Sequence, residues 1–132
     1  MKPLLGTISV ICLLVFISSC HGSHSEPDAT KPTVSVLKPT TGDTINLNTD
    51  SVKILLTAED NIDLHELNIK ITNGSTTVLD ESPVVHAQKI YTFAKIILPQ
   101  NITGTTALTL TATATDHSEN VGTKTVNFFV KK

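Results

Sequence analysis

Leu108-Thr109-Leu110-Thr111-Ala112-Thr113-Ala114-Thr115 is the stretch that decides the fold. Aliphatic and threonine side chains alternate in it without a break, and the side chains of a β-strand point alternately to the two faces of a sheet. One face of this strand is therefore apolar and suited to a core, whereas the other is a row of threonines suited to solvent. The pattern predicts a half-buried strand in an antiparallel sheet with one wet face.

Six further runs of β-branched or alternating apolar residues surround this strand, and turn residues close each of them. They are residues 33–36, 52–58, 67–71, 76–79, 90–98 and 126–130. Glu59-Asp60-Asn61 is expected to end the second run, and Asn73-Gly74 is a strong signal for a hairpin. No segment has a convincing amphipathic helical pattern. We therefore predict an all-β fold, a seven-stranded antiparallel sandwich over residues 33–132.

The first 19 residues have the layout of a secretory signal, with Lys2 ahead of an apolar run that ends at Ile17. This run is too short for a membrane span, which needs about 20 apolar residues. Ile17-Ser18-Ser19-Cys20 resembles the lipoprotein box of bacteria. The resemblance implies that residues 1–19 are removed and that palmitate-type chains acylate Cys20 and hold it in a membrane; an ordinary cleaved signal is the alternative. Residues 20–32 are polar and predict a flexible tether.

Composition narrows the range of functions. The 132 residues include ten lysines, no arginine and twelve acidic residues, for a net charge of −2. This balance argues against a nucleic-acid partner, which needs a basic surface. If Cys12 leaves with the leader, Cys20 is the sole cysteine and no internal disulfide can form. The chain has no nucleophile elbow, phosphate loop or nucleotide fingerprint, so no enzymatic activity is expected.

Two stretches carry a resemblance to a fold family. Residues 56–64, LTAEDNIDL, and residues 112–122, ATATDHSENVG, resemble the strand exits of bacterial immunoglobulin-like and cadherin-like surface domains. The resemblance covers residues 33–132 and is closest to small lipoprotein domains of Bacteroidota-type bacteria. It implies an immunoglobulin-like sandwich. The chain has no tryptophan and no core cysteine pair, which separates it from antibody-type domains.

In immunoglobulin strand order, the loops at residues 59–63, 80–87 and 116–122 would lie at one end of the sandwich, where the tether also enters. Calcium prefers six to eight oxygen ligands, and several acidic or amide side chains fall in these loops. We name a candidate calcium site from them, and ordinary turn chemistry is the competing explanation. The candidate ligands are Glu59, Asp60, Asp63, Asp116, Glu119 and Asn120.

The five histidines are scattered along the sequence. His21 and His24 fall on the tether, and we interpret His65, His86 and His117 as single polar surface residues. His65-Glu66 has no second histidine at the spacing of a zinc-protease motif.

Two further surface features are candidates for contacts or modification. Tyr91 and Phe93 share a strand face and, with Phe129, could form a docking patch, although core filling is the competing role. Thr44 and Ser51 lie in Asp-Ser/Thr-aliphatic triplets that resemble the O-glycosylation site of Bacteroidota-type bacteria.

From the sequence we expect a lipid-anchored, non-catalytic binding or structural module of the cell envelope, held at the outer membrane. The sequence is compatible with either the periplasmic face or the surface face of that membrane. Its partner would be an envelope protein or a glycan. The alternatives are a glycan-binding surface lipoprotein and a calcium-stabilised, cadherin-like adhesion module.

Overall fold

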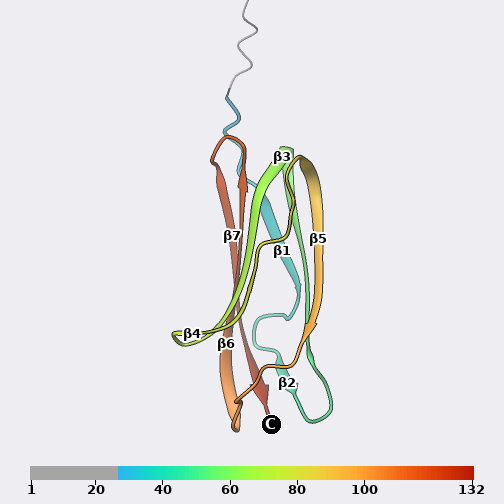
Figure 1. Ribbon diagram of the computed structural model, residues 1–132, viewed down its shortest axis with the longest axis vertical. Helices are drawn as coiled ribbons and strands as arrows, with labels where there is room; N and C mark the ends of the chain where they lie inside the picture. The colour runs from blue at the N-terminus through green and yellow to red at the C-terminus, as the bar shows by residue number, and fades with distance from the viewer. Residues whose placement is uncertain (1–26) are drawn as a thin grey trace, which may run out of the picture.

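The computed structural model describes residues 27–132, which form seven β-strands (Figure 1). The leader and Cys20 lie outside the described residues. Among residues 27–132, no helix is long and apolar enough to cross a membrane. The strands are β1 (Thr33–Lys38), β2 (Thr44–Asn46), β3 (Val52–Asn73), β4 (Thr76–Glu81), β5 (Gln88–Ile97), β6 (Thr105–Asp116) and β7 (Val121–Lys131).

β3 belongs to both layers of a sandwich. Its first part pairs antiparallel with β1 and β5, and its second part pairs antiparallel with β4 and β6. Figure 1 shows the chain reaching one end of the molecule and turning back within β3. β7 pairs with β6, and β2 completes the second layer beside β7. The predicted all-β sandwich is confirmed, with the strand order of an immunoglobulin-like domain.

Three details differ from the prediction. Residues 60–63 stay within β3, so the runs at 52–58 and 67–71 are parts of one 22-residue strand. β2 was not predicted, because a three-residue strand is too short to show a period in the sequence. β2 also pairs parallel with β7, so the sandwich is mixed and not wholly antiparallel.

The core follows the alternation of apolar and threonine residues that the sequence predicts for β6. Leu108, Leu110, Ala112 and Ala114 are at most 1% exposed, and the threonines between them face outward. From the other strands, Leu56, Ile71 and Phe128 pack into the same apolar cluster. Because Asp116 is two residues beyond Ala114, the same alternation turns its carboxylate inward at the end of the sandwich, where it is only 2% exposed.

The predicted hairpin is present, with its turn moved by one residue. Asn73 pairs with Thr76, so Gly74 and Ser75 are the two central residues. Only Gly74 has a positive φ, +56°, as the first central residue of a type II′ turn does.

An irregularity near the start of the second part of β3 sets the direction of His65. The register with β6 shifts between Leu64 and Glu66, so His65 is an extra residue opposite the Asp116–Thr115 step. Such a bulge breaks the alternation of faces. Leu64 and Leu67 can therefore both point into the core, while His65 projects to the surface.

Candidate functional site

The end of the sandwich where the chain enters gathers several polar segments, and we call it the tether end (Figure 1). It consists of residues 27–32, the bend of β3 at residues 60–65, residues 86–87 and the β6–β7 turn at residues 116–120. Hydrogen bonds link these segments in pairs, since the backbone N–H of Ala87 donates to the carbonyl of Leu64 and the side-chain amide of Asn120 donates to the carbonyl of Asp28. Residues 27–32, assigned to the tether from the sequence, contact the domain here.

Three carboxylates meet at the tether end. Asp28, Asp60 and Asp116 each place one oxygen within 4.8 Å of the others. They come from the tether, the bend of β3 and the end of β6. Among residues 27–132, no lysine or histidine is within ion-pair distance of these three side chains. The acidic cluster, as we call this trio, therefore brings three carboxylates together with no cationic side chain of residues 27–132 in direct contact.

Asp116 is held by the turn that follows it. Its Oδ1 accepts hydrogen bonds from the backbone N–H groups of Ser118 and Asn120, and its Oδ2 accepts one from the Asn120 amide. Burial alone would raise the pKa of Asp116, but these hydrogen bonds stabilise the charged form and bring the pKa below its usual value. The Asn120 amide also donates to the carbonyl oxygen of Asp28, which fixes the tether segment on the turn.

Asp60 differs from its neighbours because one of its oxygens has no partner. Its Oδ2 accepts hydrogen bonds from the backbone N–H groups of Ile62 and Asp63, which shapes the bend of β3. Its Oδ1 is buried and makes no hydrogen bond within the described domain. A buried carboxylate oxygen without a donor or a cation is unfavourable, so a water molecule or a cation bound at this atom would be stabilised.

The six predicted calcium ligands are only partly brought together. Asp60 and Asp116 lie together, and the Asn120 amide donates a hydrogen bond to the Asp116 carboxylate. The carboxylate of Asp63 instead forms a hydrogen bond with the ring of His117. Glu59 faces solvent because it alternates with the buried Ala58, and Glu119 stands exposed at the tip of the turn with φ +65°.

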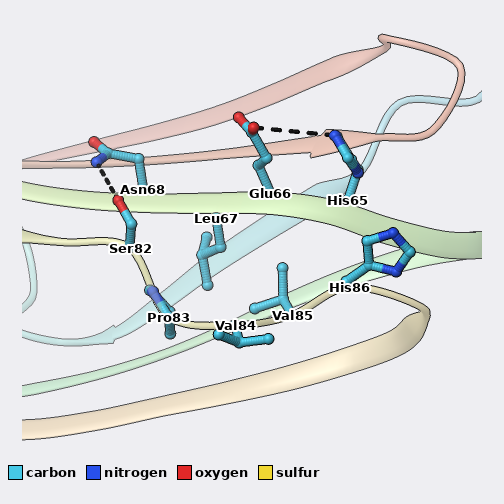
Figure 2. A pocket seen from close by; sticks show the side chains of 9 residues that line it. All are labelled: His65, Glu66, Leu67, Asn68, Ser82, Pro83, Val84, Val85 and His86. Carbon is cyan, nitrogen blue, oxygen red and sulfur yellow. Dashed lines mark hydrogen bonds and ion pairs between the residues drawn. The ribbon is translucent and has the colours of Figure 1, made fainter.

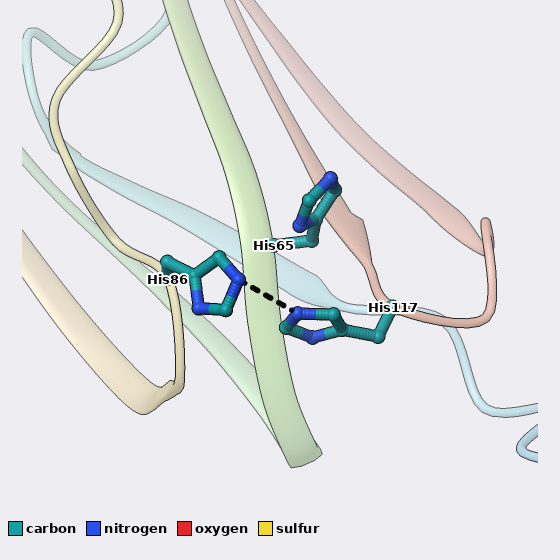
Figure 3. A group of neighbouring side chains, drawn as sticks. All are labelled: His65, His86 and His117. Carbon is teal, nitrogen blue, oxygen red and sulfur yellow. Dashed lines mark hydrogen bonds between the residues drawn. The ribbon is translucent and has the colours of Figure 1, made fainter.

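Three histidines form a second cluster at the tether end (Figure 3). His65 comes from the bulge in β3, His86 from the segment before β5, and His117 from the β6–β7 turn. Their ring centroids are 5.5 Å (His65–His86), 4.7 Å (His65–His117) and 4.6 Å (His86–His117) apart. The interpretation of these residues as single surface histidines was therefore wrong, and we call the trio the histidine cluster.

A groove of about 340 Å³ runs along the second part of β3 toward this cluster (Figure 2). Residues 82–86 form its other wall. His65 and His86 line one end of the groove, and at the other the Asn68 amide donates a hydrogen bond to the Ser82 hydroxyl. The groove and the histidine cluster thus adjoin each other beside the tether end, because His65 and His86 belong to both.

The three residues of the candidate docking patch do not lie on one exposed surface. Phe93 is only 8% exposed and belongs to the core, because it faces inward from β5. Tyr91, on the same face of β5, is half-buried against the core. Phe129 is 39% exposed but lies on β7, in the other layer. The candidate glycosylation residues are separate as well, with Thr44 exposed at the start of β2 and Ser51 half-buried before β3.

Sequence reasoning missed Asp28 and the histidine cluster for different reasons. Asp28 lies in a segment whose composition indicated a tether without contacts, and nothing in its sequence shows that it docks. The histidines are 21 and 31 residues apart, so no local motif unites them. However, the loops at residues 80–87 and 116–122 were expected at the same end as residues 59–63. The same placement applied to His65, His86 and His117 would have brought them together.

Comparisons with known proteins concern the fold alone. No family model matches the chain, and no curated protein matches it. A crystal structure of an engineered protein is similar with a TM-score of 0.54 and 17% identity, over 77% of this chain and 20% of that one. Fibronectin(III)-like modules of Clostridium thermocellum CbhA align with a TM-score of 0.48 and 15% identity, over 75% of this chain and 96% of theirs. The chain thus spans about one fifth of the length of the engineered protein and resembles it in fold.

Proposed function

We propose that the chain is a lipid-anchored, non-catalytic binding or structural module of the cell envelope, and that its tether end is the working surface. The observation that supports this proposal is the convergence of polar side chains from four separate segments at that end. Asp28, Asp60, Asp116 and the three histidines all lie there, next to the groove. The opposite end has no comparable metal-ligating group among residues 27–132. A binding role accounts for this one-sided distribution.

The proposed anchor is an acylated Cys20 in the outer membrane. A single acyl chain binds a membrane only marginally, and two or three chains give a lasting attachment. The tether then keeps the sandwich near the lipid surface with its working end toward the membrane. Confinement to this layer raises the effective concentration of the domain for an envelope partner.

Cys20→Ser is expected to move the protein out of the membrane fraction and to abolish its labelling with palmitate, because the acceptor thiol is gone. Cell fractionation and metabolic labelling measure these effects. Cys12→Ser is the matched control, since it removes the leader cysteine and should leave both results unchanged. Continued membrane association and labelling of Cys20→Ser would refute the anchor.

Calcium binding at the acidic cluster is a second candidate function. The buried Oδ1 of Asp60, which has no hydrogen-bond donor, is the observation that favours it. Three carboxylates and solvent oxygens fit the preference of calcium for hard oxygen ligands. Because Asp28 belongs to the tether segment, a bound ion would also attach that segment to the sandwich. This arrangement supports a calcium-stabilised adhesion module.

Millimolar Ca²⁺ is expected to raise the melting temperature of the full chain by several degrees over EDTA, since a ligand that binds only the folded state stabilises it. Differential scanning calorimetry measures this shift. Asp60→Asn should remove the response, whereas Glu59→Gln, one residue away and facing solvent, should keep it. A melting temperature that does not change with Ca²⁺ would eliminate this candidate.

A glycan is the alternative partner. Sugar-binding sandwiches commonly use exposed aromatic platforms, and the burial of Phe93 removes part of that basis. The groove offers hydrogen-bonding groups instead, among them Asn68 and Ser82. A glycan-binding role would therefore depend on the groove, and Asn68→Ala would weaken it more than Phe129→Ala.

A further inference from the structure

The geometry points to a transition-metal site in the histidine cluster: His65, His86 and His117 bind one divalent first-row ion of the zinc type through their ring nitrogens. Each side chain offers a nitrogen, and the three nitrogens lie within 4.8 Å of one another. The rings come from three separate segments (Figure 3). Their convergence is a property of the tertiary fold and not of one loop.

The His86–His117 pair is already close to coordination geometry. Nε2 of His86 is 3.2 Å from Nε2 of His117. Two ligands in a tetrahedral site with zinc–nitrogen bonds of about 2.0–2.1 Å are separated by about 3.3 Å. The nitrogens of His86 and His117 therefore already have the separation of two ligands of one ion. A nitrogen of His65 lies within 4.8 Å of the other ligand atoms and would supply the third ligand when the ring moves closer.

Asp63 gives His117 the orientation that a metal ligand needs. Nδ1 of His117 lies 2.6 Å from Oδ1 of Asp63. An ionised carboxylate only accepts hydrogen bonds, so Nδ1 is the donor, and in the neutral ring that binds a metal Nε2 then has the free electron pair. Metal-binding histidines commonly donate their other N–H to a carboxylate in this way. Asp63 is thus a positioning residue for the site.

The donor set selects the class of ion. Three imidazole nitrogens suit Zn²⁺, Cu²⁺ and Ni²⁺, whereas Ca²⁺ and Mg²⁺ prefer oxygen. Three protein ligands leave a fourth position of a tetrahedral ion for water or for a ligand from outside. All three histidines are exposed, so this position is accessible. The tether end would then hold two chemically distinct ions: a hard cation such as Ca²⁺ at the acidic cluster and a transition-metal ion such as Zn²⁺ at the histidine cluster.

Isothermal titration of the full chain, purified in detergent, with Zn²⁺ tests the proposal. We expect binding of one equivalent that Ca²⁺ and Mg²⁺ do not compete away. His86→Ala and His117→Ala should each weaken this binding by at least about tenfold, and Asp63→Asn should weaken it by about 10–100-fold. All three histidines are exposed, so their substitution should leave the fold intact, and circular dichroism checks this.

Two controls separate this site from other sources of binding. The double variant His21→Ala/His24→Ala removes the remaining histidines of the chain and should bind Zn²⁺ as the original does. Co²⁺ should give the strong visible absorption of a tetrahedral ion in the original chain and lose it in His117→Ala. The proposal is overturned if the original chain binds no Zn²⁺, if binding survives substitution of the cluster, or if the double variant alone abolishes it.

Discussion

Phe128→Ala is expected to lower the free energy of unfolding by about 3–5 kcal/mol, the typical cost of removing a buried phenylalanine ring from a core. Phe128 is fully buried, on β7, and it lies opposite Leu108 in the neighbouring β6. Its ring fills the space between the two layers, so alanine would leave a cavity that the strands cannot close. Urea unfolding of the purified chain measures the loss as a lower midpoint with an unchanged slope.

Phe129→Ala is the matched control for this result. Phe129 is the next residue on β7 and points to the other face, where it is 39% exposed. Its removal should cost only about 1–2 kcal/mol, because much of its surface is already in water. Equal losses for the two variants would mean that the faces of β7 are assigned incorrectly.

Gly122→Ala is expected to lower the free energy of unfolding by about 3 kcal/mol, which is the upper end of the usual cost of overpacking. A Cβ atom at this position would lie 1.8 Å from the carbonyl oxygen of Pro32 and 2.8 Å from its carbonyl carbon. Both are backbone atoms, which cannot turn aside as a flexible side chain can. The start of β7 and the end of the tether segment would have to separate.

This separation should also be visible locally. Asp28 is held through the amides of Asn61 and Asn120, and a displaced Pro32 would pull it away from them. Amide hydrogen exchange should therefore increase over residues 28–36 in Gly122→Ala, and any calcium response should weaken. Thr125→Ala, at an exposed position of the same strand, is the control and should show neither effect. Gly122→Ala with original stability and exchange would contradict the close contact.

The fold could be predicted from the sequence because burial in a sandwich follows a period of two. The alternation of β6 placed Leu108, Leu110, Ala112 and Ala114 correctly, and it continues to Asp116. The prediction failed where the period is broken or too short to read. β2 has three residues, and its parallel partner β7 is distant in sequence. The bulge at His65 and the bend at residues 60–63 depend on side-chain and register effects that a binary pattern does not contain.

The candidate site could be predicted only as a location. Strand order was sufficient to bring three loops to one end, and the structure places Asp60 and Asp116 together there. The sequence pattern could not show which of the neighbouring carboxylates join the acidic cluster. Asp63 lies only three residues from Asp60, yet its carboxylate forms a hydrogen bond with His117. Asp28 joins the acidic cluster through tertiary contacts with Asn61 and Asn120 that have no local signature.

Site-specific photocrosslinking in intact cells tests most directly whether the tether end is the working surface. A photoreactive residue at the exposed Ser118, in the β6–β7 turn, would sample this end, and one at the exposed Thr103, between β5 and β6, would sample the opposite end. We predict a discrete crosslinked product from position 118 and none from position 103. A product from position 103 alone, equal products from both positions, or no product from either would contradict the account.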